Sequence, residues 1–180
     1  LTSYHEHNEK EKAEELIKKL SQGQDVALTS DAGMPGISDP GYELIHKAVA
    51  EGIEVISIPG PTALISALVV SGLPMERFSF QGFLPRGGRD REKRMEEIKT
   101  SAITTVFYES PYRVQSTLQD LKQLIKNRKI ALVREITKLH EEKIYGTVEE
   151  VLKKIENKEI KGEIVVVVEG RDRTEVEEKA

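Results

Sequence analysis

A run of five consecutive β-branched residues, 164–168, is the feature that most restricts the fold of this chain. Successive side chains of a strand point to opposite faces of a sheet, so a continuous apolar run predicts a strand that is buried on both faces. Such a sheet needs helices to cover it. The run therefore predicts a buried strand of an α/β protein.

Helical and strand patterns alternate along the preceding residues. In the first part of the chain we expect short strands at 26–28 and 55–58 and helices over 13–20 and 44–49. Asn8 and Glu11 are spaced as a capping pair for the first helix, and Asp39 with Pro40 predicts the start of the second. The segment 63–70 is apolar almost all round, which predicts a buried helix.

Gly72-Leu73-Pro74 interrupts the pattern, and we place a domain boundary there. We expect an N-terminal α/β domain over 1–74 and a C-terminal α/β domain over 75–180. Strands are predicted at 78–83, 103–108, 130–133 and 143–145, with a helix starting at Ser110-Pro111 and a second capping pair at Thr147 and Glu150. The chain starts without Met, so we interpret it as a fragment of a longer protein.

The composition excludes several classes of protein. The chain has 180 residues, no cysteine and a formal net charge of −4, so it has no disulfide frame and no thiol nucleophile. No apolar run approaches the roughly 20 residues that span a bilayer, and no secretory signal is present, so we expect a cytoplasmic protein without a membrane partner. A mildly acidic chain is not coated with nucleic acid, although a local basic patch remains compatible with it.

Ligands of α/β sheets bind beyond the carboxyl ends of strands, which directs attention to the turns at 30–35, 59–63 and 108–113. Asp31, beside two glycines, is suited to accept hydrogen bonds from ribose hydroxyls, or it only stabilises a tight turn. The second turn begins a helix, whose free N–H groups attract carboxylate or phosphate, or it is an ordinary connection. Neither turn is a P-loop.

Charged residues cluster at three further places. The segment 86–94 contains only two acidic residues and five basic ones, Arg86, Arg89, Arg91, Lys93 and Arg94. This excess of positive charge predicts a contact with phosphate groups, unless the segment is simply solvated. The clusters 109–113 and 134–138 follow strands and supply a base, a proton donor or a phosphate clamp, or they are Arg–Glu pairs that hold loops. His5 and His7 lack further ligands of the right kind, so no metal site is expected.

Five segments together carry a resemblance to a known family: 30–41, 58–63, 82–86, 107–113 and 134–138. They resemble the tetrapyrrole methylase superfamily, and within it the methylases that modify a cytidine 2′-hydroxyl of small-subunit (16S) ribosomal RNA. The resemblance implies two α/β domains with S-adenosylmethionine (SAM) in the cleft between them, a homodimer, a ribosomal RNA partner and no metal. It also implies that the first strand, helix and strand of the first domain and a C-terminal extension are absent here, so that the first domain is truncated.

The resemblance further assigns residues by motif. The SAM-facing residues, with contacts made largely by the backbone, are Asp31, Met34, Thr62, Ala63, Tyr108, Val133, Arg134 and Glu163. The catalytic candidates are Glu109, Arg113 and Lys138, with Glu135 as another possible base. Arg86, Arg89, Arg91 and Arg94 are expected to contact RNA phosphates. The alternatives are a tetrapyrrole (precorrin-type) or other SAM-dependent methylase, or an inactive fragment that only dimerises or binds nucleotide.

Overall fold

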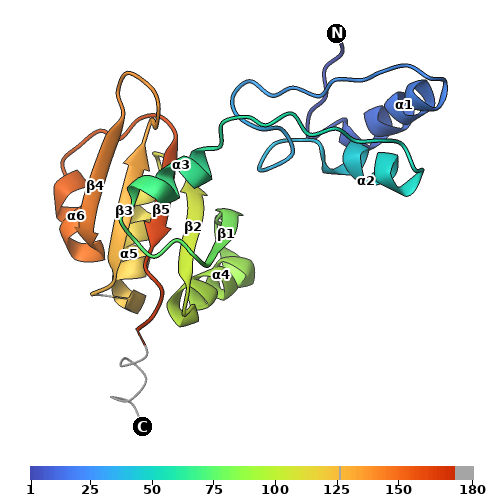
Figure 1. Cartoon of the computed structure of the whole chain (residues 1–180). Helices are drawn as coiled ribbons and strands as arrows, with labels where there is room; N and C mark the ends of the chain where they lie inside the picture. Colours follow the sequence, from blue (N-terminus) through green and yellow to red (C-terminus); the bar gives the residue numbers. More distant parts are fainter. Residues whose placement is uncertain (126, 173–180) are drawn as a thin grey trace. The chain divides into compact units, whose positions relative to one another are not determined.

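The structure, a computed structural model, describes residues 1–125 and 127–172 (Figure 1). The chain divides into two compact units, Leu1–Thr62 and the remainder from Ala63 onwards. No helix among the described residues is long and apolar enough to cross a membrane.

The second unit is built on one five-stranded sheet with the order β1-β2-β5-β3-β4. The strands are β1 (Phe78–Phe83), β2 (Thr104–Glu109), β3 (Lys129–Arg134), β4 (Glu142–Thr147) and β5 (Ile164–Val168). β1 and β2 are parallel, whereas β5 is antiparallel to both of its neighbours, β2 and β3. The strand predicted from the β-branched run is therefore the middle strand, and it is buried along its whole length.

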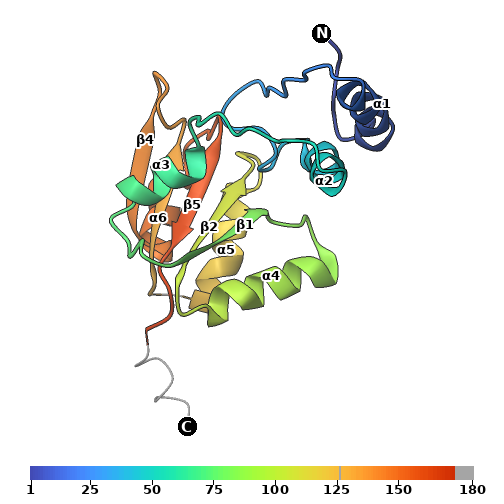
Figure 2. The ribbon, with the colours of Figure 1, turned by 45° about the vertical axis from the view of Figure 1, so that its right-hand side comes forward.

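Helices cover both faces of this sheet, as Figure 2 shows. α4 (Gly88–Thr100), α5 (Val114–Ile125) and α6 (Val148–Ile155) pack on the face that carries Phe107, Leu132 and Val166. α3 (Ala63–Val70) packs on the other face, which carries Val106 and Val165. Alternate residues of each strand enter opposite layers. The predicted α/β class is confirmed.

Helix α3 forms where it was predicted, but the prediction that it is buried all round is wrong. Leu64, Ala67 and Leu68 lie against the sheet, whereas Ile65 and Val69 are 45% and 59% exposed. An outer helix touches its sheet along one side only, which leaves part of its other side exposed. Because α3 packs on this sheet, the compact units divide before it, whereas the predicted domain limit follows residue 74 and stays a prediction.

The first unit contains two helices and, among its described residues, no strand. α1 (Glu9–Ser21) and α2 (Tyr42–Ala50) pack through Ala13, Leu16 and Leu44. The strands predicted at 26–28 and 55–58 are wrong: no described residue forms a backbone hydrogen bond with either segment. A strand exists only with a partner, and its apolar sequence does not supply one. Ile56 and Ile58 are consequently exposed.

The helix caps show which local signals hold. Thr147 and Glu150 form the predicted capping box of α6. Asn8 is the N-cap residue of α1, as predicted, but its side chain accepts a hydrogen bond from the His5 N–H (2.8 Å) and makes no capping bond. The predicted start of the second helix is wrong. α2 begins after Gly41 rather than at Pro40, and its first N–H groups are met by Glu9 of α1, whose Oε1 lies 2.9 Å from the Gly41 nitrogen. This distant carboxylate has no local sequence signal.

Candidate functional site

One edge of the sheet collects the predicted site residues of the second unit. β1, β2 and β3 end at this edge and β5 begins there, with Glu109 and Arg134 both paired to Ile164. The loops that follow the three strands therefore lie along one edge, in the order of their strands in the sheet. The predicted residues at this edge are Arg86, Tyr108, Glu109, Arg113, Val133, Arg134, Lys138 and Glu163.

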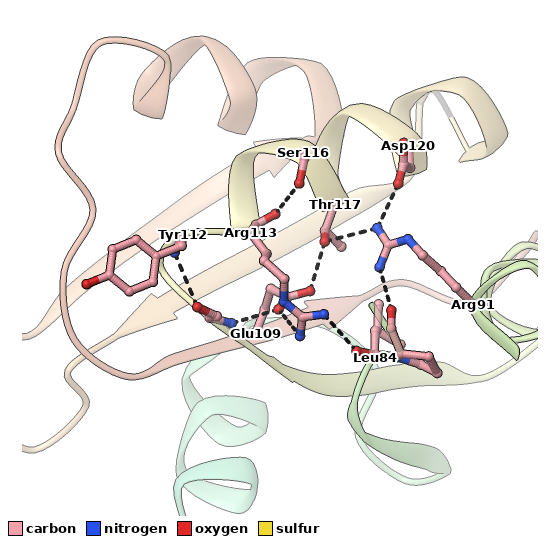
Figure 3. A network of polar contacts seen from close by, with 10 residues as sticks. Leu84, Arg91, Glu109, Tyr112, Arg113, Ser116, Thr117 and Asp120 are labelled. Atoms are coloured by element: carbon pink, nitrogen blue, oxygen red, sulfur yellow. Dashed lines mark hydrogen bonds and ion pairs between the residues drawn. The ribbon is translucent and has the colours of Figure 1, made fainter. Parts of the chain in front are cut away.

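A buried carboxylate anchors the centre of the edge (Figure 3). The Glu109 side chain is 0% exposed. Its Oε1 accepts a hydrogen bond from the Ser110 N–H (2.7 Å) and pairs with Arg113 (2.6 Å), while its Oε2 accepts one from the Thr117 hydroxyl (2.8 Å). A buried charge is stable only with such partners. Glu109 therefore joins the end of β2 to the first turns of α5.

Two guanidinium groups extend this network to the loop after β1. Arg113 Nη1 donates to the Leu84 carbonyl (3.1 Å) and Arg91 Nη1 to the Pro85 carbonyl (3.1 Å). Arg91 Nη2 also donates to the Thr117 hydroxyl (3.2 Å) and to Asp120 (2.7 Å), as Figure 3 shows. For the cluster 109–113, these contacts match the predicted alternative that its charge pairs hold loops.

The four arginines predicted to bind RNA divide into two kinds. The side chains of Arg86 and Arg89 are exposed, and neither guanidinium group has a hydrogen-bond or ion-pair partner within residues 1–125 and 127–172. Arg91 is 15% exposed and occupied as described above. Arg94 is half-exposed and contacts Gln81 (3.0 Å) and Glu97 (2.9 Å). Only Arg86 and Arg89 present an uncompensated charge.

An exposed aromatic residue at the same edge was not predicted. Tyr112 is 95% exposed, and its side chain points away from the network in Figure 3. The signal was present in the sequence, because the residue lies between Pro111 and Arg113 in a turn after a strand. The neighbouring ring of Tyr108 is instead engaged, since it packs on Phe80 and Phe83 with ring centroids 5.0 and 5.5 Å apart.

The loop after β3 is held in an unusual conformation. Glu135 and Thr137 both have positive φ angles, 49° and 66°. Glu135 Oε1 accepts hydrogen bonds from the Glu163 N–H (2.8 Å) and from Lys138 Nζ (2.9 Å), and the Glu135 N–H donates back to the Glu163 carbonyl (2.9 Å). This reciprocal pair, which we call the Glu135 clamp, binds the loop to the residue before β5.

The charges of the clamp perturb one another. The Glu163 N–H, and then Lys138, lower the pKa of Glu135, and Glu135 followed by Glu163 raises the pKa of Lys138. A carboxylate with a lowered pKa is a weaker base. Gly162 was also missed: its φ is +87°, and a Cβ there would overlap the Glu135 carboxyl group.

Two predicted cofactor residues of β3 differ in their surroundings. The Val133 side chain is fully buried with α3, and its backbone lies in the ladder between β4 and β5. The Arg134 side chain pairs with Glu142 (3.2 Å) and donates to the Lys161 carbonyl (3.1 Å). Both side chains are therefore engaged within the protein.

In the first unit two predicted loops approach each other. Gly33, at φ +79°, is so near that a Cβ on it would lie 3.2 Å from the Pro61 carbonyl oxygen. Ser30 donates its hydroxyl hydrogen bond within its own loop, to the carbonyls of Ala32 (3.2 Å) and Gly33 (3.1 Å). Asp31 is exposed and has no partner among the described residues, and Met34 is partly buried. Thr62 ends this unit, and Ala63 begins α3.

The described residues contain no group of three or more side chains able to hold a metal ion. The rings of His5 and His7 contact each other edge to face, with centroids 6.0 Å apart.

A helix-covered sheet whose strand-end loops carry these motifs defines the class of protein. The chain belongs to the tetrapyrrole (corrin/porphyrin) methylases, whose family model matches residues 2–152. The predicted family is thereby confirmed.

Within that family, its curated relatives include proteins named ribosomal RNA small subunit methyltransferase I. The relative from Halalkalibacterium halodurans is 49% identical over 179 residues, which cover 99% of this chain and 62% of the relative. The relative from Thermotoga maritima is 46% identical, with coverage of 96% and 77%, and that from Bacillus subtilis is 41% identical, with coverage of 99% and 61%. The chain thus spans about 60% of two of these relatives and 77% of the third.

Solved structures show the same fold at low sequence identity. Diphthine synthase superposes with a TM-score of 0.68 at 14% identity, covering 92% of this chain and 68% of its own. The methyltransferase CobJ gives 0.66 at 20% identity, with coverage of 90% and 71%. A uroporphyrin-III C-methyltransferase from Thermus thermophilus, solved with S-adenosylhomocysteine, gives 0.58 at 17% identity, with coverage of 89% and 73%.

Proposed function

We propose that this chain is part of a SAM-dependent methyltransferase that methylates the 2′-hydroxyl of a cytidine in small-subunit ribosomal RNA. The observation that carries the proposal is identity of 41–49% over almost the whole chain to proteins named for methylation of that RNA. The strand-end motifs agree with it. The proposal includes a homodimer that acts in the cytoplasm on the small ribosomal subunit.

The proposed cofactor is SAM, with S-adenosylhomocysteine as product. When bound, SAM supplies a methyl group that is activated by a positively charged sulfonium. Asp31, exposed and without a partner, is suited to accept hydrogen bonds from ribose hydroxyls, and Gly33 leaves bare backbone beside Pro61. The proposed set is completed by Met34, Thr62, Ala63, Tyr108, Val133, Arg134 and Glu163.

The proposed RNA contacts are electrostatic and aromatic. Arg86 and Arg89 are free to pair with phosphates, and the first N–H groups of α4, which no side chain caps, lie between and beside them. Tyr112 offers an exposed ring on which an unpaired base can stack. Arg94, which is half-exposed, reaches phosphate only by leaving Gln81 and Glu97.

The proposed catalytic residues have different roles. A ribose hydroxyl becomes a good nucleophile only when its proton leaves or the developing alkoxide is stabilised. Arg113, whose side chain is 25% exposed, is the proposed cation for this charge, and Glu109 fixes its position. Lys138 is the second candidate cation, although two carboxylates already surround it. Alanine at Glu109, Arg113 or Lys138 should lower turnover more than SAM affinity.

The decisive experiment incubates the complete protein with methyl-labelled SAM and purified unmethylated small ribosomal subunits. Label on the 2′-oxygen of one cytidine, mapped by nuclease digestion and mass spectrometry, would establish the reaction. If SAM binds but no RNA is labelled, tetrapyrrole and protein acceptors become the candidates. If SAM does not bind, the alternative of an inactive, dimerising or nucleotide-binding protein gains support.

A further inference from the structure

We propose that Thr117 and Arg91 are positioning residues that fix the substrate loop, residues 84–89, from inside the protein. The proposal rests on the proposed function, because it concerns the loop that presents Arg86 and Arg89 to RNA. In this proposal Arg91 holds the loop in place and does not bind phosphate. Thr117, which is fully buried, affects RNA binding without touching RNA.

The substrate loop is held at the point where it leaves β1. Pairing of β1 with β2 ends at Phe83. Beyond it, the Leu84 side chain is buried, and the carbonyls of Leu84 and Pro85 accept hydrogen bonds from Arg113 and Arg91. Arg86 follows directly, and Gly87 and Gly88 add no side chains. The two guanidinium contacts are therefore the last described anchors before the free arginines.

Arg91 is itself held by the hydroxyl group of Thr117. Its Nη2 donates to the Thr117 hydroxyl, and that hydroxyl donates its own hydrogen to Glu109 Oε2. One hydroxyl thus accepts from a cation and donates to a buried anion, which suits its single donor and two lone pairs. Networks of this kind strengthen each member bond in a buried setting. Figure 3 shows the path from Glu109 through Thr117 to Arg91.

Arg91, Glu109 and Thr117 do not serve as RNA ligands themselves. Asp120 balances the charge of Arg91 at 2.7 Å, and Arg91 is 15% exposed. Glu109 and Thr117 are inaccessible. The free charge belongs to Arg86 and Arg89, whose placement depends on the carbonyls that precede them.

The test compares Thr117→Val, which keeps the volume but removes the hydroxyl, with Thr117→Ser, which keeps the hydroxyl. Backbone order parameters of the amides at 86 and 87 are measured by nuclear magnetic resonance in the complete protein, without RNA. We expect Thr117→Val to lower these order parameters from about 0.85, the value of rigid backbone, to below about 0.6, and Thr117→Ser to leave them unchanged. Unchanged exchange of the β5 amides shows that the sheet remains folded.

The second measurement is the Kd for small-subunit RNA. Thr117→Val should raise this Kd about tenfold, Thr117→Ser should restore it, and the Kd for SAM should stay within about twofold of the unsubstituted protein. Arg91→Met should raise the RNA Kd similarly, and the double variant should be no worse than either single one, since both cut the same path. Unchanged loop order parameters in Thr117→Val, or an equal loss of order in Thr117→Ser, would overturn the proposal.

Failure of the proposed function gives a different pattern. If Arg86→Ala and Arg89→Ala leave the RNA Kd unchanged, the loop is not the RNA site, while lowered loop order parameters in Thr117→Val still support the positioning role. If the two arginines matter but Thr117→Val changes neither the order parameters nor the Kd, only the positioning role is lost.

Discussion

At the scale of single residues, Gly162 shows how a loop can require the absence of a side chain. Its φ of +87° lies in the left-handed region, and a Cβ would collide with the Glu135 carboxyl group of the clamp. Gly72 has a similar φ of +71°, but nothing lies within 4 Å of its missing Cβ. A substitution at Gly72 therefore adds backbone strain alone, whereas a substitution at Gly162 adds backbone strain and a clash.

We therefore expect Gly72→Ala to lower the free energy of unfolding by about 1–2 kcal/mol, the cost of the left-handed backbone. Gly162→Ala should cost at least about 1 kcal/mol more, because the Glu135 carboxylate must give up its bonds. Urea denaturation measures both. In a Glu135→Ala background the excess at Gly162 should vanish; an excess that persists there would contradict the clamp.

Tyr112 allows a second test at this scale. Stacking of a base on an aromatic ring contributes about 1–3 kcal/mol, so Tyr112→Ala should raise the RNA Kd about fivefold to a hundredfold. Tyr112→Phe keeps the ring and should bind RNA nearly normally. Fluorescence anisotropy with labelled RNA measures both variants. Equal Kd values for Tyr112→Ala and Tyr112→Phe would remove the ring from the proposed surface.

At the scale of elements, α6 is the helix whose start follows its sequence most closely. Thr147 Oγ1 accepts a hydrogen bond from the Glu150 N–H (3.3 Å), and Glu150 returns one to the Thr147 N–H (2.8 Å). Thr147→Ala should lower the free energy of unfolding by about 1 kcal/mol in urea denaturation, whereas Thr147→Ser should be close to neutral. Equal losses in the two variants would show that the hydroxyl is not the stabilising group.

The loop between β3 and β4 should respond to pH through the Glu135 clamp. The lowered pKa of Glu135 means that its stabilisation is present above the ordinary glutamate value, about 4.3, and is lost as pH falls through the lower folded value. The raised pKa of Lys138 means that its stabilisation is present below about 10.4 and is lost as pH rises through the higher folded value. The clamp is therefore intact between about pH 5 and 10.

Nuclear magnetic resonance can follow this titration at the Glu163 amide, which donates directly to Glu135. We expect a shift of that amide proton with a midpoint below the ordinary glutamate pKa, and no such shift in Glu135→Gln. A midpoint at or above the ordinary value would mean that the clamp does not hold Glu135 in its charged form.

At the scale of the whole molecule, the net charge of −4 opposes RNA binding, so the local basic surface must act at short range. Arg86→Ala and Arg89→Ala should each flatten the plot of log K against log salt concentration by about 0.7–0.9, the value for one phosphate contact. Lys99→Ala, at the opposite end of α4, makes the same change in net charge and should leave the slope unchanged. Similar slopes for all three variants would indicate a general charge effect.

The sequence was most informative where a structure depends on neighbours along the chain. The Thr147–Glu150 box has both of its members within a few residues, and it was predicted correctly. The buried strand at 164–168 was also predicted correctly from its continuous apolar run, although its partner strands β2 and β3 lie far away in the sequence. The rule that ligand sites follow the carboxyl ends of strands pointed to the turn 108–113, which holds Glu109 and Arg113. The five motifs together indicated the family.

Tertiary structure alone decided which of those residues are free and which are occupied. Arg86 and Arg91 are both charged residues that follow β1, yet Arg91 is held by Thr117, which lies 26 positions away, whereas Arg86 faces solvent. The segments 26–28 and 55–58 have strand-like sequences but no partner among the described residues. Propensity and periodicity are properties of the local chain, whereas burial, pairing and charge compensation depend on contacts that only the folded chain brings together.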